Sequence, residues 1–364
     1  MNILLLTDEL FPGGVARHVV DLANGLKSKE ISVSVAATDG TYRQSLHPDI
    51  PFVPLTLLEA NSFRKNLSGI FPSYFKLCKL VNTTRFDIIH SHKRLSHFLG
   101  SLIPKRTAKH ITSYHNVFPG KDILSVFGDY TVCCSNAVAA MVTTRYKKSP
   151  SRTSTVYNGM LPLKLHDDIR RRETYEELHI PVSKKIISSV GQFIPSKDRE
   201  TLIRAVKILH DENKIANVVF VLLGFGYLQS QLEQLVRSLN LEQHVKFAES
   251  LFSIEALVNI SEFMILNPKH SEGFGIVLLE GASVSKIHIG TSIGGIPEFI
   301  EQNQTGLLVS PENPSELAQA ISFLLDNPAE CVRMGQNAKM KFERYFQLEK
   351  MLSNMIEVYR KVLA

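Results

Sequence analysis

Short apolar runs of strand length alternate with amphipathic helical patterns along the whole chain, and this alternation constrains the fold more than any other feature. Ile3–Leu6 is a continuous apolar run, as expected for a strand that is covered on both faces. Gly13 and Gly14 follow, and from Val15 to Leu26 apolar residues recur at helical spacing. Repeated units of this kind predict an α/β protein with parallel sheets.

The length of the chain and the order of these patterns predict two domains. At roughly 150 residues per domain, 364 residues can form two hydrophobic cores. We place the linker in the polar stretch from Asn158-Gly159 to Arg170-Arg171-Arg172. The predicted domains are 1–165 and 166–345, and a final helix at 346–364 packs back on the first. The predicted strands are Ile3–Leu6, Ile31–Ala36, Phe86–Ile89, His110–Ser113, Tyr130–Cys133, Thr153–Tyr157, Lys185–Val190, Val218–Leu223, Val245–Phe247, Phe263–Leu266 and Ile287–Gly290.

The N-terminal segment and the cysteines favour a cytoplasmic protein. Met1–Leu10 has no basic residue before its apolar run, so we expect no signal peptide. No stretch reaches the roughly 18 charge-free apolar residues of a membrane-spanning helix. The 4 cysteines are too few and too irregularly spaced for a disulfide framework or a cysteine zinc site. We expect them to be core residues in a reducing compartment.

The positive charge is concentrated in the first half of the chain. Residues 1–160 carry 19 Lys and Arg against 10 Asp and Glu, a net charge of +9, whereas residues 161–364 carry 22 against 25, a net charge of −3. This excess is either the scatter of a solvated surface or a face for an anionic partner, such as a membrane leaflet or a phosphorylated acceptor. We expect no nucleic-acid partner, because no nucleic-acid-binding motif accompanies the charge. The basic clusters are Arg64-Lys65, Lys105-Arg106-Lys109 and Arg145-Lys147-Lys148-Arg152.

The segment His270–Ala282 contains the strongest local motif. Glu272 and Glu280 are separated by seven residues, and Gly273-Phe274-Gly275 lies between them, just before an apolar stretch. Such a turn leaves backbone N–H groups free at a helix N-terminus, where phosphate or sugar oxygens bind. A glycine turn with a capping acid is the alternative interpretation of these residues considered alone.

This segment resembles the signature of glycosyltransferase family 4, the large group of retaining GT-B enzymes that use nucleotide sugars. The resemblance extends along nearly the whole chain in the order of the family's motifs. Each motif is weak by itself, but the series is specific. The matching motifs are Gly13-Gly14, Tyr114-His115-Asn116, Tyr157-Asn158-Gly159, Val190-Gly191-Gln192-Phe193 to Lys197-Asp198, Leu223-Gly224-Phe225-Gly226, Gly294-Gly295-Ile296-Pro297-Glu298 and Thr305-Gly306-Leu307-Leu308-Val309.

The resemblance implies a GT-B fold, with two Rossmann-like parallel-sheet domains facing a central cleft. It implies that Glu272 lies by the hydroxyls of the donor sugar, that Lys197 neutralises the departing diphosphate, and that His115 faces the sugar from the first domain. It also implies that Gly13 and Gly14 form the glycine loop of the first domain. The other donor-binding residues that it implies are Gly273, Phe274, Gly275 and Ile276, by the sugar and diphosphate, and Glu280, by the ribose hydroxyls.

Two positions depart from the family's pattern. The family has an arginine where this chain has Gln192, so half of the cationic clamp on the diphosphate is missing. Arg199 or Arg17 is a candidate replacement, because only a guanidinium offers a permanent charge and a bidentate contact. The second departure is Val284–His288, where the family has small residues, Gly and Pro.

The implied reaction moves a sugar from a nucleoside diphosphate, here a UDP-sugar, to a hydroxyl of a lipid-linked or polysaccharide acceptor. The anomeric configuration is retained by front-face attack, in which the leaving phosphate takes the proton of the acceptor. We expect no cofactor and no metal ligand, because the chain has no Asp-x-Asp pair. We also expect peripheral attachment to the inner face of an anionic membrane.

The sequence leaves two other functions to weigh against this one. A non-catalytic descendant of the fold would act as a nucleotide-sugar sensor or partner subunit. A nicotinamide dehydrogenase is disfavoured, because Gln229 stands where the dinucleotide motif after Gly224 needs its last glycine.

Overall fold

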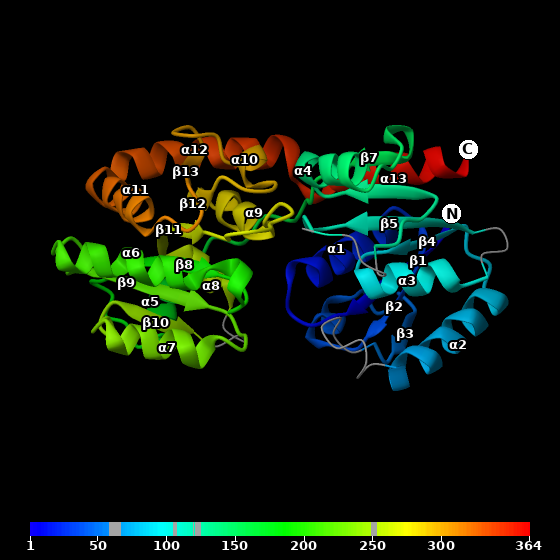
Figure 1. The fold of residues 1–364 in the computed structure, drawn as a ribbon, viewed down its shortest axis with the longest axis horizontal. Coiled ribbons are helices and arrows are strands. Elements are labelled where there is room, and N and C mark those ends of the chain that lie inside the picture. Colours follow the sequence, from blue (N-terminus) through cyan, green and yellow to red (C-terminus); the bar gives the residue numbers. More distant parts are fainter. Residues whose placement is uncertain (58–66, 105–107, 119, 121–124, 249–252) are drawn as a thin grey trace. The chain divides into compact units, whose positions relative to one another are not determined.

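The structure is a computed structural model that describes residues 1–57, 67–104, 108–118, 120, 125–248 and 253–364 (Figure 1). The chain divides into two compact units. The first unit contains Met1–Met160 and Phe346–Ala364, and the second contains Leu161–Tyr345. The predicted boundary at residue 165 lies within the first segment of the second unit.

The first unit is built on a parallel sheet of seven strands in the order β3-β2-β1-β4-β5-β6-β7. Every neighbouring pair in this sheet is parallel. The chain order reverses between β1 and β4, the kind of position where open α/β sheets bind ligands. The strands are β1 (Asn2–Glu9), β2 (Ser32–Thr38), β3 (Phe52–Leu55), β4 (Ile88–Ser91), β5 (Lys109–Tyr114), β6 (Tyr130–Cys133) and β7 (Thr153–Thr155).

Helices cover both faces of this sheet, because the side chains of β1 alternate between two cores. Ile3 and Leu5 belong to a core with residues of α1 (Gly14–Ser28) and α13 (Leu348–Leu363). Leu4 and Leu6 belong to a second core with residues of α2 (Leu67–Thr83) and α3 (Arg94–Leu102). The final helix α13 therefore completes the core of the first unit. The remaining helical segments are η1 (Thr41–Ser45), α4 (Asn136–Ala140), η3 (Met141–Arg145) and η4 (Pro150–Arg152).

One strand of this sheet was not predicted. β3 pairs only with β2, at the edge of the sheet, and contains Pro54. A proline cannot donate to the ladder, so it is tolerated at an edge but weakens the strand pattern in the sequence. As a result, the strand before His115 is the fifth in the chain and not the fourth.

The second unit has a parallel sheet of six strands in the order β10-β9-β8-β11-β12-β13. Its strands also pair in parallel throughout. The two sheets confirm the predicted α/β class. The strands are β8 (Lys185–Val190), β9 (Val218–Leu223), β10 (Val245–Ala248), β11 (Ser261–Leu266), β12 (His288–Thr291) and β13 (Gly306–Val309).

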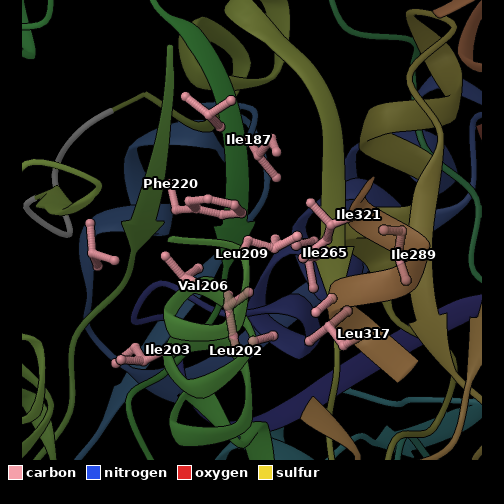
Figure 2. Packing of buried hydrophobic residues seen from close by; sticks show 14 of the residues in the cluster. Ile187, Leu202, Ile203, Val206, Leu209, Phe220, Ile265, Ile289, Leu317 and Ile321 are labelled. Carbon is pink, nitrogen blue, oxygen red and sulfur yellow. The ribbon is translucent and has the colours of Figure 1, made fainter. Parts of the chain in front are cut away.

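The main core of the second unit lies between this sheet and the helices on one of its faces. Figure 2 shows Ile187, Phe220 and Ile265 from the sheet against Val206 of α6 and Ile321 of α11. The opposite face packs against α5, α8 and α9.

Among the described residues, no helix of the chain combines the length and apolar character needed to cross a bilayer. The helical segments of the second unit are α5 (Asp168–Glu177), η5 (Pro195–Lys197), α6 (Arg199–Asp211), α7 (Gln229–Ser238), α8 (Ile254–Ile260), α9 (Ile276–Ser283), α10 (Ile296–Phe299), α11 (Pro314–Asp326) and α12 (Pro328–Tyr345).

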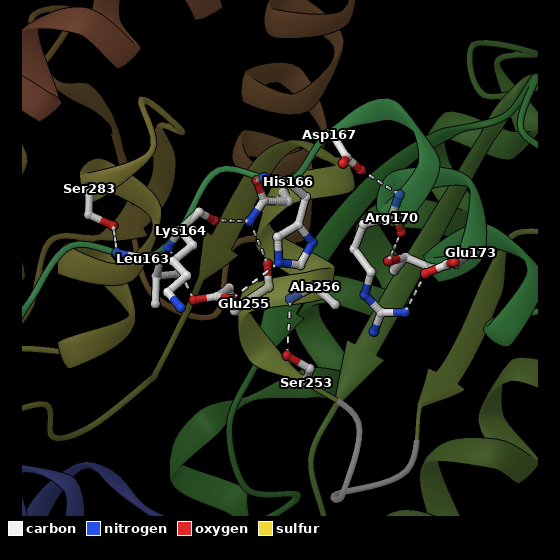
Figure 3. A network of polar contacts seen from close by, with 12 residues as sticks. Leu163, Lys164, His166, Asp167, Arg170, Glu173, Ser253, Glu255, Ala256 and Ser283 are labelled. Carbon is white, nitrogen blue, oxygen red and sulfur yellow. Dashed lines mark hydrogen bonds and ion pairs between the residues drawn. The ribbon is translucent and has the colours of Figure 1, made fainter.

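The segment that enters the second unit is held to α8 and α9 by backbone donors (Figure 3). The Leu163 amide donates to Ser283 Oγ over 3.1 Å, and the His166 amide donates to Asn259 Oδ1 over 2.9 Å. Asp167 then caps α5 by accepting from the Arg170 amide. The predicted linker is wrong at its end, because Arg170–Arg172 lie in this helix.

A buried histidine of the second unit should make its stability depend on pH. His288 of β12 is 1% exposed, and burial lowers its pKa to about 3. The unfolded chain therefore binds a proton that the folded unit does not, so this contribution is present above pH ~6.5 and is lost as the pH falls towards 3. At pH 5 the loss is about 2 kcal/mol at ~1.4 kcal/mol per pH unit.

We therefore expect His288→Val to flatten the acid side of the stability profile. Chemical denaturation followed by circular dichroism at pH 7 and pH 5 measures the effect. The free energy of unfolding should fall less in the variant than in the wild type between these pH values. An equal fall in both proteins would mean that His288 does not carry this dependence.

Candidate functional site

Lys197 and Glu272 meet at the carboxyl ends of two neighbouring strands of the second unit. Lys197 ends the short helix η5, which follows β8, and Glu272 lies in the loop after β11. Lys197 Nζ donates to Glu272 Oε2 over 2.5 Å, with side-chain exposures of 23% and 11%. The two side chains that the resemblance places at the donor sugar and diphosphate are thus an ion pair that keeps a path to solvent.

Polar contacts between the two loops explain how these side chains come together. Asn267 Nδ2 donates to the Asp198 carbonyl over 2.7 Å, and the Lys269 amide donates to the Ser196 carbonyl over 2.9 Å. Asp198 has a left-handed backbone, with φ of 48°, which Asp tolerates better than most residues. This conformation ends η5 and starts α6 within one residue, so Lys197 stands at a sharp turn.

Two glycines fix the turn that carries Glu272. Gly275 has φ of 90° and precedes α9, and a Cβ there would lie 2.7 Å from Leu266 Cδ2 at the end of β11. Gly294 has φ of 53°, and a Cβ there would lie 1.8 Å from the Glu272 carbonyl oxygen. Both positions need glycine for backbone conformation and for space. The Gly273-Phe274-Gly275 turn leads directly into Ile276, the first residue of α9, as the motif predicts.

Glu280 and Arg199 are more deeply buried than the ion pair. Glu280 lies on α9 and is 5% exposed, and its contact with a ribose stays a prediction. Arg199 is 2% exposed, and its Nη1 donates to Ser189 Oγ. Its Nε and Nη2 have no hydrogen-bond partner among the described residues, and burial lowers its pKa to about 10.

The position of the missing clamp arginine is open to solvent. Gln192 is exposed, next to Gly191 at the end of β8. Arg199 Nη2 lies 3.0 Å from where a Cβ of Gly191 would be, so a permanent positive charge lies directly behind this turn. Arg17, the other candidate replacement, belongs to the first unit and pairs with Asp21 at 3.3 Å.

In the first unit, Gly13 and Gly14 are exposed and lead into α1, as the glycine-loop motif predicts. His115 follows β5 directly and is half-buried. Burial, with His18 and His90 nearby, lowers the pKa of His115 well below its ordinary value. A neutral imidazole at this position can donate or accept one hydrogen bond at neutral pH.

Two further histidines, His18 and His92, lie close to His115, and neither belongs to a recognised motif. His18 lies on α1, and His92 directly follows β4. One ring nitrogen from each of His18, His92 and His115 lies within 4.8 Å of the others. His92 lies three residues after the predicted strand Phe86–Ile89, which is a usable signal, whereas the pattern of His18 is that of any residue in an amphipathic helix.

Comparison with known proteins identifies the family. The model of group 1 glycosyl transferases matches residues 170–341, and the model of glycosyltransferase family 4 matches residues 12–160. The chain belongs to the family 4, group 1 glycosyltransferases. The predicted resemblance is confirmed.

Relatives and a solved structure match most of this glycosyltransferase. It is 26% identical to N-acetyl-alpha-D-glucosaminyl L-malate synthase of Bacillus anthracis, over 87% of this chain and 86% of the relative. It is 25% identical to D-inositol 3-phosphate glycosyltransferase of Corynebacterium glutamicum, over 77% and 73%. The crystal structure of Anabaena HepE in complex with UDP-glucose superposes with a TM-score of 0.85 at 19% identity, over 99% and 100%. The fold is therefore GT-B.

Proposed function

We propose that this glycosyltransferase moves a sugar from a UDP-sugar to a hydroxyl of a lipid-linked or polysaccharide acceptor, with retention of the anomeric configuration. The observation that carries the proposal is the Lys197–Glu272 ion pair, set against the glycine turn that begins α9. The UDP-glucose bound by HepE supports a uridine donor. Mass spectrometry of products from a panel of UDP-, GDP- and ADP-sugars tests this choice.

The proposed chemistry uses positive charge and N–H groups aimed at the leaving diphosphate. The bond between the anomeric carbon and the phosphate oxygen breaks, and the acceptor oxygen bonds to the same face of that carbon. The leaving phosphate oxygen takes the acceptor's proton, so the atoms balance without a protein nucleophile. Lys197 stabilises the charge that develops on the diphosphate, and Glu272 binds the sugar hydroxyls. In this scheme transfer needs no metal ion and no cofactor.

The second unit would bind the donor and the first the acceptor. The net charge of +9 on residues 1–160 fits an anionic acceptor. The names of two relatives include anionic compounds, L-malate and inositol 3-phosphate. These similarities support a phosphorylated or otherwise anionic acceptor in cell-surface glycan or glycolipid assembly.

The diphosphate clamp gives a first test in the second unit. We expect Gln192→Arg to bind UDP about 10-fold more tightly, because a charged hydrogen bond contributes ~1.5 kcal/mol or more. Titration calorimetry with UDP measures the change. Arg199→Met tests whether Arg199 supplies the positive charge in the wild-type protein. This variant removes the charge and leaves most of the buried volume filled. Unchanged affinity in both variants would mean that the diphosphate binds elsewhere.

Attachment to an anionic membrane would use the exposed cations of the first unit. Arg145, Lys147 and Lys148 are exposed, whereas the Arg64-Lys65 and Lys105-Arg106 clusters lie outside the described residues. Phe71 and Phe75 on α2 are 60% and 67% exposed, as aromatic residues at a bilayer surface would be. Each cation near an anionic leaflet contributes about 1 kcal/mol.

We expect the protein to sediment with anionic vesicles and not with neutral ones. High salt, or the replacement of Arg145, Lys147 and Lys148 by Ser, should abolish this sedimentation, because both remove the electrostatic attraction. Replacement of Arg204 and Arg237 of the second unit is the matched control and should have little effect. Equal recovery in the supernatant with both vesicle types would refute the membrane proposal.

A further inference from the structure

Three imidazoles from separate segments of the first unit converge at the carboxyl ends of its central strands. The ring centroid of His18 lies 4.7 Å from that of His115 and 5.4 Å from that of His92. His92 and His115 are stacked at 5.5 Å, and His92 Nδ1 lies 3.2 Å from His115 Nε2. Because the three come from α1 and from the ends of β4 and β5, the topology of the sheet brings them together.

Part of the hydrogen-bonding capacity of this cluster is unused. His18 is 3% exposed and its ring interacts with the Asn158 side chain, but neither of its ring nitrogens makes a hydrogen bond of good geometry with the described residues. His92 is 1% exposed, and its Nε2 also has no partner there. Buried polar atoms without partners cost free energy, so a cluster of them favours a ligand that supplies the partners.

The chemistry of the donors selects the ligand. Neutral imidazoles present lone pairs, and three of them within 4.8 Å can bind one cation after small side-chain movements. Imidazole favours Zn²⁺, Cu²⁺, Ni²⁺ and Co²⁺, whereas Mg²⁺ and Ca²⁺ prefer oxygen ligands. We propose that His18, His92 and His115 form a binding site for a divalent transition-metal ion of the Zn²⁺ class.

The surroundings of the cluster suit such a site. His115 is half-buried, so the cluster is not sealed from solvent, as the entry of an ion requires. The ring of His90 lies 4.1 Å from that of His92, and His90 is itself held by Tyr359 Oη and Ser113 Oγ, each at 2.7 Å. These hydrogen bonds fix His90, and the fixed ring of His90 in turn limits the movement of the His92 ring.

The ion would inhibit sugar transfer and would not assist it. This step rests on the proposed function, in which His115 faces the donor sugar. Metal coordination would take the His115 nitrogen away from the sugar. Metal binding itself does not depend on that function, because it is measured without a donor.

Metal binding is tested on the full chain after chelator treatment. Equilibrium dialysis against Zn²⁺ alone should give one equivalent per chain with micromolar or tighter affinity, and excess Mg²⁺ should not displace it. Substitution with Co²⁺ should give the visible absorption of an ion with imidazole ligands. Absence of a stoichiometric ion, or a cobalt spectrum typical of thiolate ligands, would overturn the proposal.

Variants locate the ion within the chain. His18→Ala, His92→Ala and His115→Asn should each weaken Zn²⁺ binding at least about 100-fold, because even outer-shell partners are worth 10- to 100-fold. His210→Ala is the matched control. The rings of His210 and His244 lie 5.1 Å apart in the second unit, so this variant also removes one member of a pair of neighbouring histidines. Circular dichroism checks that each variant is folded. His115→Asn should disturb the hydrophobic core least, because His115 is half-buried whereas His18 and His92 are buried. Binding that survives His115→Asn, or that is lost in His210→Ala, would place the ion elsewhere.

Discussion

Lys197→Ala and Glu272→Ala should each lower turnover about 10²- to 10³-fold, the usual cost of removing one well-placed contact to developing charge. The melting temperature should change little. Both side chains retain some solvent exposure, so the charge left behind can be hydrated. A loss of about 1 kcal/mol would lower the melting temperature of a unit of this size by ~2–4 °C. Steady-state kinetics with the best donor, together with thermal melting, measure both quantities.

An ion pair on the solvent-facing side of α6 is the matched control. Arg204 Nη2 lies 2.7 Å from Glu200 Oε1, and both side chains are 52% exposed. Arg204→Ala removes a similar contact from the same unit and should leave turnover unchanged, because exposed pairs contribute only ~0–1 kcal/mol. If Lys197→Ala loses stability and activity in proportion, the pair is structural and the assignment of the site is wrong.

Gly294→Ala should damage both the fold and the activity of the second unit. The added Cβ would lie 1.8 Å from the Glu272 carbonyl oxygen, and φ at this position is 53°. A left-handed alanine and the forced movement of the loop together should cost about 2–4 kcal/mol. The movement also shifts Glu272 away from Lys197. Denaturant unfolding and turnover, measured on the same preparation, should therefore both fall.

Gly120→Ala gives the reference for this substitution. A Cβ at Gly120 would meet no atom within 4 Å among the described residues, so stability and turnover should stay at wild-type values. If Gly294→Ala unfolds at the same denaturant concentration as the wild type, the loop accommodates the added Cβ without clashing with the Glu272 carbonyl oxygen. The close approach of Gly294 to Glu272 would then have no energetic importance.

The proximity of Lys197 and Glu272 could be predicted because their motifs are contiguous. Lys197 and Glu272 each follow a strand that the apolar runs marked clearly, and parallel strands place their carboxyl ends at one edge of the sheet. The sequence could not show that Arg199 is buried behind Gly191 while Gln192 is exposed. That arrangement depends on the turn at Asp198, where a residue other than glycine has a left-handed backbone.

The features missed in the sequence lack local periodicity. α5 has only Thr174 buried, so its polar residues show no apolar stripe and resemble a linker. β3 is a short edge strand interrupted by Pro54. His18 and His92 are 74 positions apart in the sequence, and only the packing of α1 beside the sheet brings them together. Spacing along one segment cannot reveal such a cluster.

The most direct test of the central claim follows donor turnover by proton NMR. The purified protein is incubated with UDP-glucose and the other nucleotide sugars of the panel, in the presence of EDTA and without acceptor. Slow hydrolysis should release UDP with the free sugar first appearing as the α-anomer, and Lys197→Ala should abolish it. Donor binding without any turnover would instead indicate a non-catalytic sensor or partner subunit, and initial release of the β-anomer would contradict a retaining transfer.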